Sequence, residues 1–335
     1  MKPMHHLSAE DSAALHSALG EVKGDPYRDR ATFSRSVAAL IAGGQLPTAF
    51  GEACAAIRAE RESGQSLAHV IRNCPVDSDL PTLDHDDPVS DKRARKKTFI
   101  GEALLELFAQ LVKTPLLAYA RRFNGDFYTD VVAINRYSGK QTGFSDGELV
   151  YHNDRTAHSV RADFITLLGM VCPDEDLVYT GFVDGRTILA HLSAAEQTAL
   201  RQPWFVTPFD VLSKDNNKGL IVSETHSILE NEYSLRYLDT HTTVAPQCPP
   251  EAKDALLAFK NALARAEKTR HRILTGDLFS FANQDGLHNR EKIDVRSPER
   301  ARGRWLLKTY AFRDRAGAAC HSSRWVTGVE GLVDD

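Results

Sequence analysis

The hydrophobic pattern of this chain changes near residue 125, and this change limits which folds the chain can adopt. Before it, apolar residues recur at helical spacing. After it, short segments rich in β-branched and aromatic residues alternate with turn residues. These segments cover residues 126–137, 148–152, 163–171, 176–183, 202–212 and 304–312. Many short strands separated by turn signals predict a β-barrel or a β-sandwich.

Helical patterns dominate the first ~90 residues and return as two later inserts. Ser8 is a predicted N-cap, and the strongest helical pattern, over residues 98–123, should be broken or ended by Pro115. The basic run 92–97 is expected to be a solvated helix start. We therefore predict three parts and two inserts: a helical N-terminal region (1–98) packed on the core, a β-rich core (99–315), a C-terminal tail (316–335), and helical inserts at 193–202 and 249–269.

Composition excludes several classes of protein. The chain is 42% hydrophobic and 26% charged, as in globular proteins, and no stretch approaches the ~20 apolar residues of a membrane helix. A net charge of −4 argues against a nucleic-acid binder, and the N-terminus has no apolar segment typical of a secretory signal. The five cysteines form no C-x-x-C pair, which predicts reduced thiols in a cytoplasmic protein rather than a zinc ribbon or a disulfide framework.

Two histidines and one carboxylate are the candidate metal ligands. In "LVYHNDRTAH", His152 and Asp154 lie two residues apart, so on a strand they would share one face. His288, in "LTGDLFSFANQDGLHNR", has the best context for a third ligand. Such a set with open positions suits a non-haem Fe(II) oxygenase, but a zinc hydrolase could use the same ligands. H-x-D alone is weak evidence, because an exposed strand end often accounts for it.

A possible carboxylate-binding pair strengthens the metal hypothesis. Arg304 lies on the predicted strand after His288, and an arginine fork matches a carboxylate. Thr180 lies on another strand and could add a hydroxyl donor. A metal triad with such a cradle suits a chelating dicarboxylate such as 2-oxoglutarate. Taken alone, Arg304 would more often be a surface ion-pair residue, and Arg302 is a rival for its role.

Residues 100–315 resemble the Fe(II)/2-oxoglutarate dioxygenases of the clavaminate synthase-like and taurine dioxygenase group. The resemblance is to the branch that hydroxylates free amino acids such as arginine and asparagine. It rests on "KQTGFSDGELVYH", "HNDRTAHSVRADF" and "GDLFSFANQDGLHNR…RGRWLLK". It implies a mainly β fold with helical additions (α+β) around a double-stranded β-helix, the jelly-roll or cupin-like core. It also implies iron ligands His152, Asp154 and His288, with Arg304 and Thr180 anchoring 2-oxoglutarate.

The resemblance further implies hydroxylation of an unactivated C–H bond in a free amino acid or a derivative. Fe(II) would be bound, 2-oxoglutarate and O2 would be consumed, and succinate and CO2 would be released. Gln141, Ser145 and Lys308 are candidate substrate-binding residues, although Lys308 replaces an arginine of the family and lacks its fork. His158 is expected to be structural.

Several alternatives stay open from the sequence. Desaturation or ring closure would use the same site. A zinc hydrolase on a cupin-like barrel would share the triad but would not need the Arg304–Thr180 pair. A non-catalytic β-barrel binding protein would bind no iron. The expected partner is a small molecule rather than a nucleic acid or a membrane, and an oligomer is possible.

Overall fold

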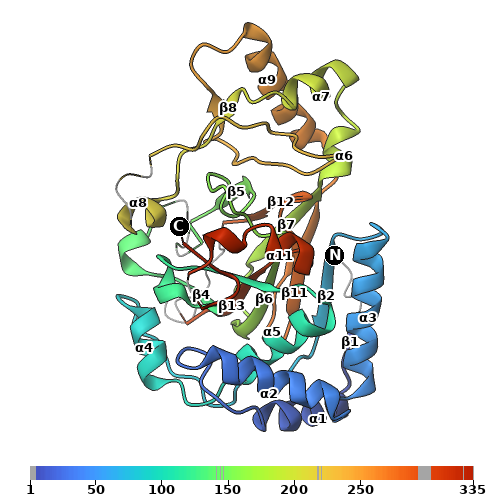
Figure 1. Cartoon of the computed structure of the whole chain (residues 1–335), viewed down its shortest axis with the longest axis vertical. Coiled ribbons are helices and arrows are strands. Elements are labelled where there is room, and N and C mark those ends of the chain that lie inside the picture. Colours follow the sequence, from blue (N-terminus) through green and yellow to red (C-terminus); the bar gives the residue numbers. More distant parts are fainter. Residues whose placement is uncertain are drawn as a thin grey trace.

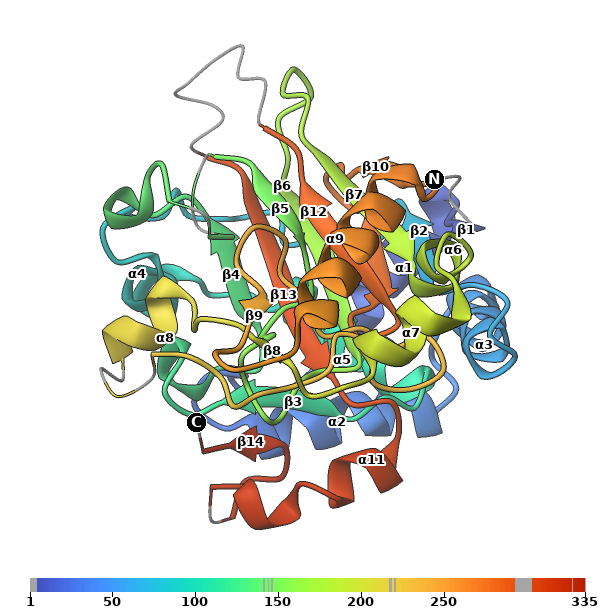
Figure 2. The same ribbon diagram turned by 90° about the horizontal axis from the view of Figure 1, so that it is seen from above.

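The computed structural model describes residues 5–140, 142, 143, 145, 147–216, 219, 221–292, 303–326 and 328–334. Two β-sheets form the centre of the molecule (Figures 1 and 2). The larger has the strand order β1-β2-β11-β6-β13-β3-β14, with β4 also paired to β13, and the smaller has the order β10-β7-β12-β5. Phe281 of the larger sheet contacts His288 of the smaller sheet, with ring centroids 4.7 Å apart. The predicted β-rich α+β jelly-roll fold is confirmed.

The strands of both sheets are short. In the larger sheet they are β1 (His5–His6), β2 (Ala68–Arg72), β3 (Leu116–Tyr119), β4 (Thr129–Val132), β6 (Phe164–Val171), β11 (Leu278–Ala282), β13 (Trp305–Ala311) and β14 (Leu332–Val333). In the smaller sheet they are β5 (Leu149–His152), β7 (Tyr179–Asp184), β10 (Thr269–Arg272) and β12 (Gly286–Arg290). A separate pair joins β8 (Phe205–Val206) to β9 (Thr243–Val244).

Strand β6 lies in the middle of the larger sheet because it is apolar along almost its whole length. Its side chains are buried from Phe164 to Met170, and it pairs antiparallel with both β11 and β13. Helix α5 (Ile100–Leu111) packs against β6 and β13 and separates them from the N-terminal helices. It ends before Pro115, as predicted, and the chain then enters strand β3.

Three N-terminal helices cover α5: α1 (Ala9–Gly20), α2 (Arg30–Ala42) and α3 (Thr48–Glu62). Ser8 caps α1 by accepting a hydrogen bond from the Asp11 amide at 3.0 Å, as predicted. The N-terminal region is not only helical, because β2 pairs with β11. Four of the five β2 residues are buried, so this run lacks the alternation that identifies a strand by sequence.

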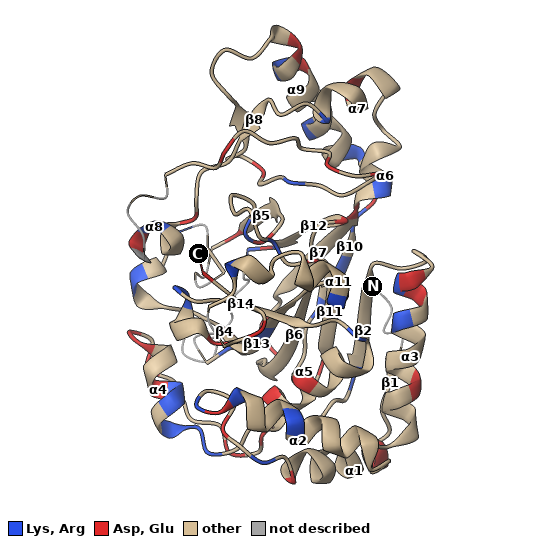
Figure 3. Cartoon of the chain, in the orientation of Figure 1, with Lys and Arg blue, Asp and Glu red and all other residues tan. Residues whose placement is uncertain are grey.

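Helix α4 (Pro88–Arg95) corrects the expectation for the basic run 92–97. The run lies at the end of the helix rather than its start, and two of its lysines are not solvated although α4 carries blue segments in Figure 3. Lys92 is 1% exposed and forms an ion pair with Asp130 at 2.7 Å. Lys96 is 3% exposed and lies 2.6 Å from Glu102 and 3.0 Å from Asp77. Buried ion pairs therefore join the N-terminal region to the core.

Helices α7 and α9, at the top of Figure 1, pack on each other and contribute to a second hydrophobic cluster. Its helices are α6 (Gly185–Leu189), α7 (Ala194–Leu200) and α9 (Pro250–Arg265), and α7 and α9 match the two predicted inserts. Two further short helices, α8 (Val211–Asn216) and α11 (Arg315–Ala319), lie outside this cluster. The C-terminal residues also join the larger sheet, since β14 pairs with β3. Within the described residues, no helix is both long and apolar enough to cross a membrane.

Candidate metal centre and its cavity

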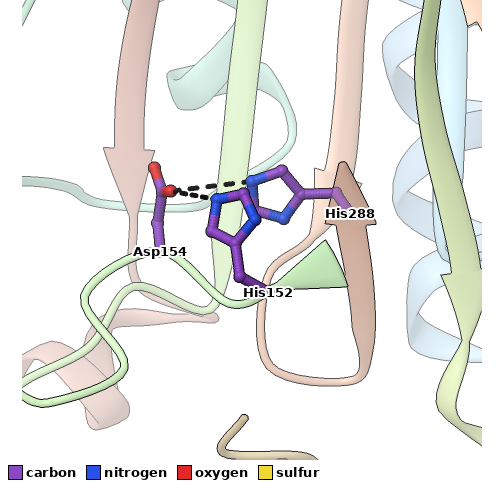
Figure 4. Close-up of side chains that lie close together, drawn as sticks. All are labelled: His152, Asp154 and His288. Carbon is purple, nitrogen blue, oxygen red and sulfur yellow. Dashed lines mark hydrogen bonds and ion pairs between the residues drawn. The ribbon is translucent and has the colours of Figure 1, made fainter. Parts of the chain in front are cut away.

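Strand pairing brings the two candidate histidine ligands together. In the antiparallel pair β5–β12, His288 lies directly opposite His152, and their ring centroids are 4.2 Å apart. Asp154 follows in the turn after β5, where its amide donates to Oδ1 of Asn283 at 2.8 Å. The next residue, Arg155, has a φ of 63°, so the chain turns sharply after the carboxylate. The three side chains converge, as Figure 4 shows, and their ligand atoms lie within 4.8 Å of one another.

The protonation states favour metal binding. Nδ1 of His152 donates to the Val150 carbonyl at 2.7 Å, which leaves Nε2 facing Asp154 Oδ1 at 3.1 Å. Burial, together with the neighbouring His152, lowers the pKa of His288 to about 4, so its imidazole is neutral at pH 7. Burial would raise the pKa of Asp154, but the charge of Lys308, together with the two neighbouring imidazoles, holds it well below its usual range. The result is a neutral His288 imidazole beside an ionised Asp154 carboxylate, with Nε2 of His152 facing the same point.

This donor set fits a divalent metal ion. Imidazole nitrogens and one carboxylate oxygen form the facial triad of non-haem Fe(II) oxygenases, which leaves ligand positions open. The side chains of His152 and Asp154 are 8% and 18% exposed, so the site is shielded yet reachable. Within the described residues, no other group of three His, Cys, Asp or Glu side chains brings its ligand atoms this close.

A cavity of about 160 Å³ opens beside the triad. Alternate residues of the β13 segment line it, because side chains two apart share a face. These are Arg304, Leu306, Lys308 and Tyr310. Strand β6 contributes Ile165 and Leu167, so part of the wall is apolar. One strand thus delivers an arginine, a lysine and a tyrosine to the cavity that holds the triad.

The structure places the predicted carboxylate-binding pair in this cavity. Arg304 and Thr180 both line it, and they are only 9% and 7% exposed. Within the described residues, Arg304 has no carboxylate close enough for an ion pair. Burial lowers the pKa of Arg304, and only the more distant Cys172 and Asp176 oppose this shift. A buried guanidinium in this state is well suited to an incoming carboxylate.

Lys308 contacts the triad residue Asp154. Its ammonium is 3.0 Å from Oδ2 of Asp154 and donates to the Tyr310 hydroxyl at 2.8 Å. Tyr310 in turn donates to the same Oδ2 at 2.7 Å. Tyr310 was not predicted from the sequence, although it lies on the same strand face as Arg304 and Lys308.

Two charged residues from distant segments, Arg122 and Asp210, also line the cavity. Arg122 pairs with Asp210 at 2.9 Å, and Ser213 donates to the same carboxylate at 2.9 Å. Burial would raise the pKa of Asp210, but Arg122 and Arg155 hold it below its usual range. No motif in the sequence pointed to these residues, because 88 positions separate Arg122 from Asp210.

The remaining candidates are placed as follows. Gln141 and Arg302 lie outside the described residues. Ser145 is 3% exposed, and its hydroxyl accepts a hydrogen bond from the Gly147 amide at 2.9 Å. His158 is packed between the Tyr119 and Phe209 rings, and burial lowers its pKa to about 2. That environment agrees with the structural role expected for His158.

Two of the proteins to which this chain is similar are oxygenases. L-asparagine oxygenase of Streptomyces coelicolor is 26% identical over 259 residues, which cover 76% of this chain and 73% of that protein. The structure of asparagine oxygenase in complex with Fe(II), 2S,3S-3-hydroxyasparagine and succinate superposes with a TM-score of 0.80 at 21% identity, over 99% of both chains. The non-haem iron oxygenase OrfP, solved with Fe, succinate and (3S)-hydroxy-L-Arg, has a TM-score of 0.78 at 19% identity, over 99% of this chain and 100% of that chain. These structures share the fold of this chain.

The family model described as taurine catabolism dioxygenase TauD, TfdA family matches residues 101–310. The matched range covers most of both sheets and includes all three triad residues. The resemblance predicted from the sequence is therefore confirmed: the chain belongs to the TauD/TfdA dioxygenase family.

Proposed function

We propose that this protein is an Fe(II)- and 2-oxoglutarate-dependent oxygenase that hydroxylates an unactivated C–H bond of a free amino acid or an amino-acid derivative. The reaction releases succinate and CO2. The observation that carries the proposal is the shared cavity, in which a convergent His152–Asp154–His288 triad faces the same space as the buried Arg304. The zinc hydrolase alternative has no use for such an arginine, and family membership points to a dioxygenase.

His152, Asp154 and His288 would hold the iron, and the bound iron would supply the activation of O2. His152 keeps its Nε2 aimed at the site through its bond to Val150, and His288 stays neutral because it is buried. Arg304 and Thr180 would bind the distal carboxylate of 2-oxoglutarate. Apolar Leu306 and residues of β6 keep water away from the reacting groups, which strengthens these charged contacts.

The substrate would occupy the part of the cavity near Arg122 and Asp210. An amino acid carries one carboxylate and one ammonium, and these two side chains offer one charge of each sign. Gln141, Ser145 and Lys308 remain proposed substrate contacts. Asparagine and arginine are the starting points for a substrate search, because one relative is an L-asparagine oxygenase and OrfP was solved with (3S)-hydroxy-L-Arg. All five cysteines are free thiols, which supports the predicted cytoplasmic location.

The test is anaerobic reconstitution followed by turnover. Protein loaded with Fe(II) and 2-oxoglutarate should release succinate in air, and one L-amino acid of a panel should accelerate that release and become heavier by one oxygen atom. Metal-dependent hydrolysis of ester or amide substrates by zinc-loaded protein, without succinate formation, would replace this function with the hydrolase alternative.

A further inference from the structure

The two oxygen atoms of Asp154 have different neighbours. Oδ1 faces the two imidazoles, 3.1 Å from Nε2 of His152 and 3.6 Å from Nε2 of His288 (Figure 4). Oδ2 accepts hydrogen bonds from Lys308 at 3.0 Å and from Tyr310 at 2.7 Å. Only Oδ1 is therefore free to turn toward an ion between the histidines.

The contacts to Oδ2 are built into the fold. Lys308 and Tyr310 are two apart on β13, so they share one face, and Lys308 also donates to the Tyr310 hydroxyl at 2.8 Å. Tyr310 is 6% exposed, and its ring packs edge-on against Tyr119 with centroids 5.7 Å apart. The side chain of Lys308 is 12% exposed, so its charge is held in a largely dry position.

We propose that Lys308 and Tyr310 are positioning residues that hold Oδ2 of Asp154, so that the carboxylate binds the metal through Oδ1 alone. The inference rests on the proposed function, since it assumes a metal at the triad. It gives Lys308 a role other than, or additional to, the substrate contact expected from the sequence. The ammonium has three donors, and Asp154 and Tyr310 occupy two of them.

Binding of Asp154 through a single oxygen matters because 2-oxoglutarate and O2 must occupy the remaining ligand positions of the ion. About three positions of a roughly octahedral ion remain open beside a facial triad, and a chelating 2-oxo acid takes about two of them. If Asp154 bound through both oxygens, about one fewer position would remain, and O2 would have none. Lys308 and Tyr310 would thus preserve the open position without touching it.

The experiment counts water molecules on Mn(II) bound to the full-length protein, using water-proton relaxation at saturating metal. Tyr310→Phe removes one hydroxyl and keeps the ring, and Lys308→Met removes the charge and keeps most of the length. Lys308→Arg keeps a cation at this position. Lys253→Met, on the exposed face of α9, is the control for the same substitution away from the site. Circular dichroism checks that each variant is folded.

Wild type and Lys253→Met should retain about three bound waters. The double variant Lys308→Met/Tyr310→Phe should lose about one, so the relaxation enhancement should fall by roughly a third, and Lys308→Arg should stay close to wild type. A folded Tyr310→Phe protein that no longer binds Mn(II) would overturn the inference, because freeing Oδ2 should add a ligand atom to the site rather than abolish binding. Wild-type water numbers at saturation in the double variant would overturn the inference. Failure of the wild type to bind Mn(II) would instead overturn the proposed function.

Discussion

Replacing Arg304 by Gln should remove most of the affinity for 2-oxoglutarate and leave metal binding intact. Arg304 is 9% exposed and lines the cavity of the triad, and among the described residues no carboxylate forms an ion pair with it. A co-substrate carboxylate would therefore be its main counter-charge. Losing one partner of a buried, hydrogen-bonded charge pair costs about 2–5 kcal/mol. A central value of about 3 kcal/mol corresponds to roughly a hundredfold rise in Kd.

The assay is an anaerobic titration of the Fe(II) protein with 2-oxoglutarate, in which the absorbance of the metal-to-ligand charge-transfer band reports binding. Arg304→Lys keeps the charge without the fork, so its Kd should lie between those of wild type and Arg304→Gln. Arg302→Gln tests the rival residue and should bind 2-oxoglutarate like wild type. If Arg304→Gln kept wild-type affinity while Arg302→Gln lost it, the assignment of the cradle to Arg304 would be wrong.

Three further predictions concern the hydroxyl donor, the buried charges and pH. Thr180→Val keeps the side-chain shape but removes a hydroxyl worth about 0.5–1.5 kcal/mol, so the Kd for 2-oxoglutarate should rise by up to roughly tenfold in the same titration. Lys96→Met leaves Glu102 buried without its cation, so urea unfolding at pH 7 should show an unfolding free energy lower by about 3–5 kcal/mol. This loss should shrink at low pH as Glu102 takes up a proton. A loss below about 1 kcal/mol would contradict the buried network. Burial together with Arg236 lowers the pKa of His226 to about 4, below its value of about 6.5 in the unfolded chain. The stability that depends on neutral His226 is therefore complete above about pH 6.5 and is lost as the pH falls toward about 4. His226→Gln should flatten the fall in unfolding free energy over that window by up to about 1.4 kcal/mol per pH unit, and an unchanged slope would show that His226 does not titrate there.

The class of fold was predictable because most strands are short, apolar and bounded by turn residues. Strand β2 was missed because its 5 residues lie between helical segments and four of them are buried, which removes the alternation of a half-exposed strand. The burial of Lys96 was also hidden, since its partner Asp77 lies 19 positions earlier and only the folded chain brings them together. A charged residue in a sequence does not reveal whether the folded chain will bring an oppositely charged residue to it.

The meeting of the three candidate ligands was predicted only through the family resemblance, because residue types and spacing alone do not show that His288 lies beside His152. His152 and His288 converge only because the register of β5 and β12 places them directly opposite each other, and a shift by one residue would turn one of them away. Tyr310 carried a usable signal, because it follows Arg304 and Lys308 at even spacing on one strand. Arg122 and Asp210 carried none, since their pairing depends on the path of the long segment between them.

The most direct test of the central claim is the absorption spectrum of the anaerobic protein with Fe(II) and 2-oxoglutarate. Wild type should develop a charge-transfer band that saturates at one 2-oxoglutarate per iron, and His288→Ala should lose both the band and succinate release. Full succinate release by His288→Ala, or no band from wild type that has bound iron, would contradict the account.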